Sequence, residues 1–315
     1  MSVSPGGMPR EALIAGRYRI QRRLGSGSLG TVYLARDAAA DRLVALKVIR
    51  AERLGAEGLA RLKEEFRAIA GLHHTQVAVA HDFGYTAEGG LPFYTREYVE
   101  GSPLAPGPPG IEQPVPPAEF LRPFFDLLEA LDYLHAHEIL HLDIHAGNLI
   151  VAGDPGRGSV LIDFGLWGPL RDVGSSSLVM VRSSMPPELL RKEGVGPASD
   201  LYSVGRLLLY RLTGNPESVP RLLRDIPGWG PRLTLELERI AAKALEADTR
   251  RRFQSAGEFR EALSRALGGS ARSRSRPEPG DLTLGRACEI GAIEDVLRGA
   301  ASGRTAALWF QGRAG

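Results

Sequence analysis

The chain has 315 residues, of which 43% are hydrophobic and 24% are charged, as in ordinary globular proteins. This length fills two lobes or two domains, and the formal net charge of +2 gives no reason to expect a nucleic-acid partner. The single cysteine, Cys288, excludes an intramolecular disulfide framework. Residues 1–16 lack the apolar run of a signal peptide, and no segment has the roughly 20 apolar residues that span a bilayer. We therefore expect a cytoplasmic protein with no membrane segment in this chain.

The first elements expected are two strands around a glycine-rich turn. Apolar and basic residues alternate from Tyr18 to Leu24, as on a half-buried strand. The next residues read Gly-Ser-Gly-Ser-Leu-Gly, with glycines at 25, 27 and 30. Because glycine has no Cβ, such a turn can bring its backbone N–H groups close to phosphates. Taken alone, the pattern is weak evidence, and a plain hairpin turn is its simpler explanation.

One lysine interrupts the apolar strand Val-Ala-Leu-Lys-Val, and a helix is expected after it over residues 59–72. Lys47 in a buried strand is costly unless it is paired, so it should have an acidic partner and an anionic ligand. We expect Glu65 to be the partner, because it lies one turn before Ile69 on the inward face, whereas Glu64 points away. A solvated helix face is the simpler explanation for either glutamate.

The centre of the chain carries two carboxylates and an amide at close spacing. Asp143 and Asn148 are followed, after the next apolar run, by Asp163 and then Phe-Gly. Such groups on consecutive turns beside short strands suit chemistry on a metal–polyphosphate. Asp163 can hold Mg²⁺, Asn148 can hold a second ion, and Asp143 can take a proton from a hydroxyl.

Taken in order, these motifs resemble those of bacterial Hanks-type serine/threonine protein kinases. The resemblance rests on the glycine-rich turn, Lys47 in its strand, His141-Leu142-Asp143 with Asn148, and Asp163-Phe164-Gly165. It implies an α+β, two-lobed fold, with a small β-rich N-lobe over about residues 18–97 and a helical C-lobe over about 98–267. It also implies ATP and Mg²⁺ as cofactors, a protein substrate that includes the chain itself, and a role in signal transduction.

The resemblance assigns roles to individual residues. Lys47, paired with Glu65, would hold the α/β-phosphates, Asn148 and Asp163 would hold Mg²⁺, and Asp143 would orient or deprotonate the acceptor hydroxyl. The nucleotide would also lie against Leu24, Gly25, Gly27, Gly30, Val32 and Ala45, and its adenine would meet the hinge backbone near Glu97 and Val99. Arg96 takes the gatekeeper position before the hinge, where a bulky apolar residue is usual, and the sequence gives it no role.

Two departures from the family pattern lie in the catalytic loop. Leu142 replaces the arginine that grips a phosphorylated activation loop, and His145 replaces the lysine that contacts the γ-phosphate. Histidine here is closer to small-molecule kinases related to aminoglycoside phosphotransferases. A neutral histidine can still donate one hydrogen bond but supplies no dependable charge at neutral pH. His145 is nevertheless kept among the expected catalytic residues.

The later motifs favour the protein-kinase branch. Pro-Glu at 187–188 and the segment 248–252 resemble two kinase elements, which implies an ion pair between Arg252 and Glu188. The proposed activity is transfer of the γ-phosphoryl group of ATP to a serine or threonine hydroxyl. A regulatory pseudokinase that senses nucleotide, and a small-molecule phosphotransferase, are the alternatives.

The ends of the chain have a different character. After an N-terminal tail (1–17) and the kinase-like part, residues 268–281 are rich in Gly, Ser, Arg and Pro and are expected to form a flexible linker. A strand-like run at 306–311 leads into Gly-Arg-Ala-Gly, which resembles the start of a P-loop. We therefore expect 282–315 to begin an ATPase module that is a partner of the kinase domain in a longer signalling protein. A random tail is the alternative.

Overall fold

The computed structural model describes residues 12–27, 30–50, 55–87, 89–106, 115–163, 184–191, 193–220 and 228–268, except for the side chains of 55–57 and 61. The contacts divide the chain into two units, Met1–Gly268 and Gly269–Gly315, and every described residue belongs to the first. The expected linker, apart from Gly268, and the expected ATPase start lie outside the described residues and stay predictions. Among the helices in these ranges, none combines the length and the apolar content needed to cross a membrane.

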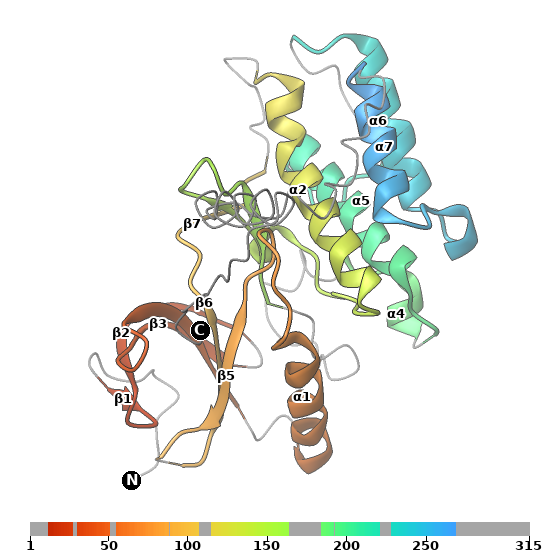
Figure 1. Cartoon of the computed structure of the whole chain (residues 1–315). Coiled ribbons are helices and arrows are strands. Elements are labelled where there is room, and N and C mark those ends of the chain that lie inside the picture. Colours follow the sequence, from red (N-terminus) through yellow and green to blue (C-terminus); the bar gives the residue numbers. More distant parts are fainter. Residues whose placement is uncertain are drawn as a thin grey trace, which may run out of the picture. The chain divides into compact units, whose positions relative to one another are not determined.

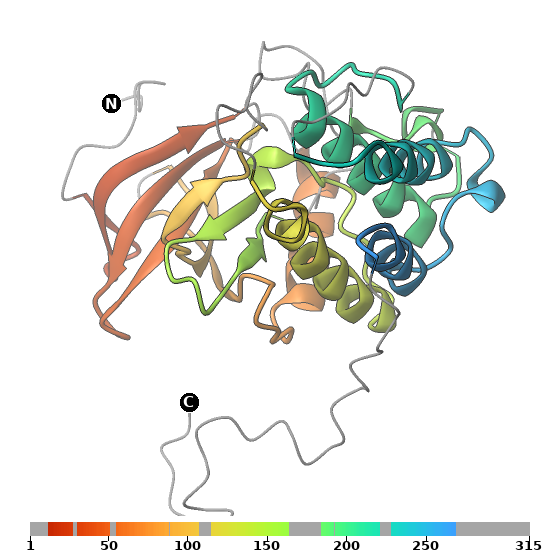
Figure 2. The same cartoon turned by 90° about the horizontal axis from the view of Figure 1, so that it is seen from above.

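The N-terminal half of the first unit is built on an antiparallel sheet with the strand order β1-β2-β3-β4-β6-β5 (Figure 1). Its strands are β1 (Leu13–Ile14), β2 (Tyr18–Ser26), β3 (Gly30–Asp37), β4 (Arg42–Ile49), β5 (Ala80–Tyr85) and β6 (Pro92–Glu97). Alternation along β2 buries Tyr18 and Ile20 and exposes Arg19, as its period-two pattern predicts. In β4, every residue from Val44 to Ile49 is buried except the half-buried Lys47. Figure 2 shows β2, β3 and β4 side by side.

The helix α1 (Gly55–Ile69) packs against this sheet through Leu62, Phe66 and Ile69, and the Phe66 ring contacts the rings of β5 and β6. The expected helix over 59–72 was wrong at both ends. Beyond Ile69 the chain makes a tighter turn, in which the N–H of Leu72 donates to the carbonyl of Ile69, three residues earlier. Leu72 is still buried, so the apolar spacing marked the inward face correctly but not the end of the helix.

The C-terminal half is mainly helical. It contains α2 (Pro117–Ala136), α4 (Pro187–Arg191), α5 (Pro197–Thr213), α6 (Pro231–Ala244) and α7 (Ala256–Ala266). A small antiparallel sheet of β7 (Gly101–Pro103), β8 (Leu149–Ala152) and β9 (Ser159–Leu161) follows the hinge. Four of these helices, α2, α4, α5 and α6, begin with proline, which suits the first turn because its N–H groups have no acceptor within the helix.

The helix α5 forms the buried centre of this half. Its Leu201, Val204 and Leu208 are fully buried, as the apolar run predicted. Where α5 crosses α6, a Cβ on Gly205 would lie 2.6 Å from the Cβ of Ala244, so only glycine fits there. This close packing holds the middle of α5 against α6, and the N-terminal turn of α5 lies next to the loop that carries Asp143.

Candidate active site

Asp200, in the first turn of α5, anchors the loop that carries Asp143. Its fully buried carboxylate accepts hydrogen bonds from the backbone N–H groups of His141 (2.9 Å) and Leu142 (2.7 Å). His135 Nε2 lies 2.9 Å from the same carboxylate. Leu142 has φ +56°, in the left-handed region that leucine rarely adopts, and the bond to Asp200 holds it there. Sequence reasoning assigned Asp200 no role, although an acidic residue at the start of a strongly apolar helix was a signal.

His141 joins this loop to the strand end before Asp163. Its buried Nδ1 accepts the N–H of Asp143 at 3.3 Å, so the neutral ring carries its proton on Nε2, which lies 3.2 Å from the Ile162 carbonyl oxygen. Burial lowers the pKa of His141 and outweighs the charges of nearby Asp200 and Asp143. A neutral His141 therefore connects the two acidic segments.

Asn148 brings the expected metal-binding groups together. Its Nδ2 donates to the backbone oxygens of Asp143 (3.0 Å) and Asp163 (3.3 Å). Because the nitrogen is used in these two bonds, the amide oxygen is the atom left to ligate a cation. Asn148 thus lies between the expected base and the expected metal carboxylate.

His145 contacts both the loop backbone and Asp143. Its Nδ1 accepts the N–H of Gly147 at 3.1 Å and caps the short 3-10 turn Ala146–Asn148. In the neutral ring the proton is then on Nε2, which lies 3.5 Å from Asp143 Oδ1. The structure therefore places the imidazole beside Asp143 and also gives it a structural role.

Two cations flank the carboxylate of Asp163. Arg96 Nε lies 2.6 Å from Oδ1, and Lys47 Nζ lies 3.6 Å from Oδ2. Burial alone would raise the pKa of Asp163, but the charges of Arg96 and Lys47 outweigh it and hold the pKa well below its ordinary range. Asp163 has φ +51°, and Asp is among the residues that tolerate this conformation.

The ion pair that the structure shows for Lys47 joins it to Asp163, next to the ring of Tyr94. Burial lowers the pKa of Lys47, but the charge of Asp163 and the Tyr94 hydroxyl outweigh it, so the net shift is upward. Glu65 is half-buried on α1, whereas Glu64 is exposed and pairs with Arg67, as its outward position predicted. The pairing of Lys47 with Glu65 stays a prediction.

The glycines of the turn between β2 and β3 have different reasons to be glycine. A Cβ on Gly30 would lie 2.1 Å from the Val48 carbonyl oxygen of β4, so Gly30 is required by close strand packing. A Cβ on Gly25 or Gly27 would meet no described atom within 4 Å. Only these two keep open space of the kind that a phosphate needs.

The hinge after β6 is held by an ion pair and by the packing of apolar residues. Arg157 forms a two-point ion pair with the Glu97 side chain at 2.5 and 2.8 Å. The Glu97 carbonyl accepts a hydrogen bond from the terminal nitrogen Nη1 of Arg96 at 3.1 Å. Val99 packs with Ala78, Ile150, Val160 and Ile162. Of the remaining expected nucleotide contacts, Leu24 and Val32 are half-buried and Ala45 is buried.

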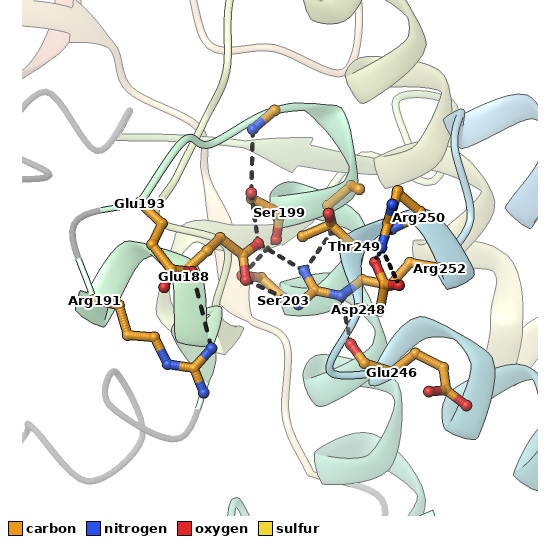
Figure 3. Close-up of polar contacts among 12 residues, drawn as sticks. Glu188, Arg191, Glu193, Ser199, Ser203, Glu246, Asp248, Thr249, Arg250 and Arg252 are labelled. Atoms are coloured by element: carbon orange, nitrogen blue, oxygen red, sulfur yellow. Dashed lines mark hydrogen bonds and ion pairs between the residues drawn. The ribbon is translucent and has the colours of Figure 1, made fainter.

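The expected ion pair of Glu188 with Arg252 is confirmed (Figure 3). The N···O distances are 2.7 and 2.8 Å, and Ser199 Oγ donates to the same carboxylate at 2.7 Å. Burial raises the pKa of Glu188, but the bonds from Arg252 and Ser199 outweigh burial and hold it below the ordinary value. The pair joins α4 to the segment before α7.

Comparisons with known proteins agree with this geometry. The family described as "Protein kinase domain" matches residues 18–220. The chain is 30% identical over 278 residues to the serine/threonine-protein kinase PknB of Mycolicibacterium smegmatis, covering 82% of this chain and 44% of that protein. It is 32% identical to the serine/threonine-protein kinase PknJ of Mycobacterium tuberculosis, covering 81% and 46%. The chain thus spans less than half the length of these relatives.

A solved structure shows the shared fold. The crystal structure of the M. tuberculosis PknI kinase domain superimposes with a TM-score of 0.64 at 23% identity, covering 84% of this chain and all of that chain. The expected two-lobed α+β fold is therefore confirmed.

Proposed function

Because the chain belongs to the protein kinase family, as the match over residues 18–220 shows, we propose that it transfers the γ-phosphoryl group of ATP to a serine or threonine hydroxyl of a protein. One observation carries the proposal: Asn148 Nδ2 donates to the backbone oxygens of both Asp143 and Asp163. These bonds join the backbone of the segment that carries the expected base to the backbone of the segment that carries the expected metal carboxylate. The similarity to the serine/threonine-protein kinases PknB and PknJ supports serine and threonine as acceptors.

The side-chain oxygens of Asn148 and Asp163 suit Mg²⁺, but Arg96 competes for one of them. Asn148 Oδ1 and the Asp163 carboxylate are hard oxygen donors on neighbouring segments, and Mg²⁺ commonly takes one or two protein oxygens together with phosphates and waters. Arg96 holds one Asp163 oxygen at 2.6 Å. When bound, Mg²⁺ would neutralise phosphate charge and align the β- and γ-phosphates.

Residues of the chain itself would bind the phosphates and activate the acceptor hydroxyl. Lys47 would bind the α/β-phosphates from β4, where Asp163 already favours its charged form. Asp143 would orient the acceptor hydroxyl and accept its proton, and the Nε2–H of His145 would stabilise the Asp143 carboxylate from 3.5 Å. Positioning and electrostatic stabilisation supply most of the rate in such reactions.

The acceptor would bind beside the catalytic loop. A pocket there is bordered by His145 and Ala146 of the loop and by Arg206, Leu207 and Tyr210 of α5. The Glu188–Arg252 pair, together with the helices after it, supports a protein acceptor over a small molecule. In a longer protein, an ATPase module beyond residue 282 would be a partner of this domain.

A second candidate function is nucleotide sensing without transfer. It is favoured by the contact of Arg96 with Asp163, because a cation at the metal carboxylate opposes metal binding. The molecule that receives the phosphate of ATP distinguishes these two candidates from each other and from a small-molecule phosphotransferase.

The test uses γ-labelled ATP, Mg²⁺ and a generic protein substrate such as casein. Label on serine or threonine of casein, or of the chain itself, is expected for wild type and should be lost in Asp143→Asn and Lys47→Ala. Loss of one electrostatic contact of this kind costs on the order of 10²–10³ in rate. Binding of ATP with no transfer above these variants would instead support the sensor. Label found only on an added small molecule would support the phosphotransferase.

A further inference from the structure

We propose that Arg96 competes with the metal–nucleotide complex for its binding site, so that the complex binds only when Arg96 releases Asp163. The inference rests on the proposed function, because it concerns the same site. It gives a role to Arg96, to which the sequence analysis had assigned none.

A single guanidinium contacts both ends of the site. Arg96 Nε lies 2.6 Å from Asp163 Oδ1, and Arg96 Nη1 donates to the Glu97 carbonyl at 3.1 Å. Adenine is expected to meet the hinge backbone near Glu97, and Asp163 is the expected metal ligand. Arg96 therefore engages one protein group needed at the base end of the nucleotide and one needed at the phosphate end.

The contact at Asp163 opposes binding of a metal to the same oxygen. Mg²⁺ binds carboxylate oxygen at about 2.0–2.1 Å in near-octahedral geometry. A guanidinium nitrogen at 2.6 Å occupies one side of Oδ1, and its charge repels a divalent cation placed there. Lys47 lies further away, at 3.6 Å from the other oxygen, and leaves more space.

Two small residues lie across the sheet from Arg96. The residues paired with Arg96 across β4 and β5 are Ala45 and Ala80, whose side chains are among the smallest. The Arg96 side chain is only 11% exposed in its contact with Asp163 and has several rotatable bonds. In this proposal, Arg96 leaves Asp163 by a change of rotamer while the strand stays in register.

Competition of this kind has a measurable consequence. The apparent dissociation constant rises in proportion as the binding-competent fraction falls. Replacing Arg96 by an apolar residue of similar length removes the competitor, so the Mg²⁺–nucleotide complex should bind more tightly. Mg²⁺ should also improve nucleotide affinity by a larger factor in that variant than in wild type.

The test is calorimetric titration with AMP-PNP, an ATP analogue that does not transfer its phosphate, with and without Mg²⁺. We expect Arg96→Met to bind Mg²⁺–AMP-PNP about ten-fold more tightly than wild type or better. Arg36→Met is the matched control, because Arg36 is an arginine of the same sheet that pairs with exposed Asp41. It should bind like wild type.

Equal or weaker binding by Arg96→Met would overturn the inference, since Arg96 would then support the nucleotide. If Arg96→Met does not fold, Arg96→Gln, which keeps one hydrogen-bond donor and loses the charge, provides the same comparison. The proposed function is tested separately, by measuring phosphate transfer with the same variants. Tighter binding without transfer would support the inference and contradict the proposed function. Transfer with unchanged affinity would support the proposed function and contradict the inference.

Discussion

Glu188 and Arg252, which are 64 residues apart, form a two-point ion pair in which the side chains are 4% and 0% exposed. Each group also has a second partner, because Ser199 Oγ donates to Glu188 and Arg252 Nε donates to the Glu246 carbonyl. In a pair buried this completely, each charge is compensated only while its partner is present. It therefore links α4 to the segment before α7 in an all-or-none manner.

Breaking this pair from one side should be costly. We expect Arg252→Met to lower the free energy of unfolding by about 3–5 kcal/mol, because Glu188 is left as an uncompensated buried charge. Urea unfolding measures the loss. The double variant Glu188→Gln/Arg252→Met should lose less than Arg252→Met alone. Arg239→Met, which breaks an exposed pair with Glu236, should change stability by less than about 1 kcal/mol. Similar losses in Arg252→Met and Arg239→Met would contradict the prediction.

The same pair predicts a dependence of stability on pH. The folded-state pKa of Glu188 lies below its ordinary value of 4.5, because Arg252 and Ser199 outweigh burial. The stabilisation is therefore complete above the unfolded-state pKa and is lost as pH falls through the folded-state pKa. Urea unfolding between about pH 6 and pH 3.5 should show a steeper loss of stability for wild type than for Glu188→Gln. Parallel curves would mean that Glu188 titrates alike in both states.

Removing the Asp200 carboxylate should damage both stability and transfer. Asp200→Ala leaves the N–H groups of His141 and Leu142 without their acceptor, at about 1–3 kcal/mol for each buried group. Misplacement of the loop by about 1 Å can cost roughly 10² in rate. The control is Asp126→Ala, which removes an acceptor for the Ser159 N–H away from this loop. It should lose stability but keep the transfer rate, measured where both variants are folded. Equal rates for the two variants would argue against the anchoring role.

Two replacements of His145 should separate its two contacts. Lysine cannot accept the N–H of Gly147, so His145→Lys should lose about 1 kcal/mol of stability, the usual worth of such a cap. It should keep transfer, because an ammonium can still reach Asp143. Asparagine can accept the same N–H, so His145→Asn should be as stable as wild type but slower in transfer. Urea unfolding and initial rates measure the two effects, and a His145→Lys variant as stable as wild type would show that the cap contributes little.

The glycines of the turn offer a matched pair of substitutions. Gly30→Ala places a Cβ 2.1 Å from the Val48 carbonyl oxygen and should destabilise the N-terminal half by about 2 kcal/mol or more. Gly27→Ala has open space and should leave stability within about 1 kcal/mol of wild type. If phosphates approach this turn, Gly27→Ala should weaken AMP-PNP binding while the melting temperature stays unchanged. A fall in melting temperature that is equal for both variants would contradict the assignment.

The elements of the fold could be predicted because each has a local pattern of apolar and polar residues. Alternation along β2, the apolar run of β4 and the apolar face of α5 follow from periods of two and 3.6 residues, which short-range sterics impose. Helix ends were less certain, as α1 shows, because the final turn depends on which carbonyls the chain meets. The Glu188–Arg252 pair was predicted only through the family resemblance.

The pairing of charges was decided by tertiary structure. From the sequence, Lys47 in an apolar strand required an acidic partner, and Arg96 at the end of β6 had no assigned role. The structure sets both against Asp163, which follows Arg96 by 67 residues in the chain. Desolvation makes some partner necessary for a buried charge, but which partner it meets depends on how the strands and the loop pack. The sequence by itself thus determined the family and the order of elements and predicted the chemistry of the site, and only the packing decided which cations lie against Asp163.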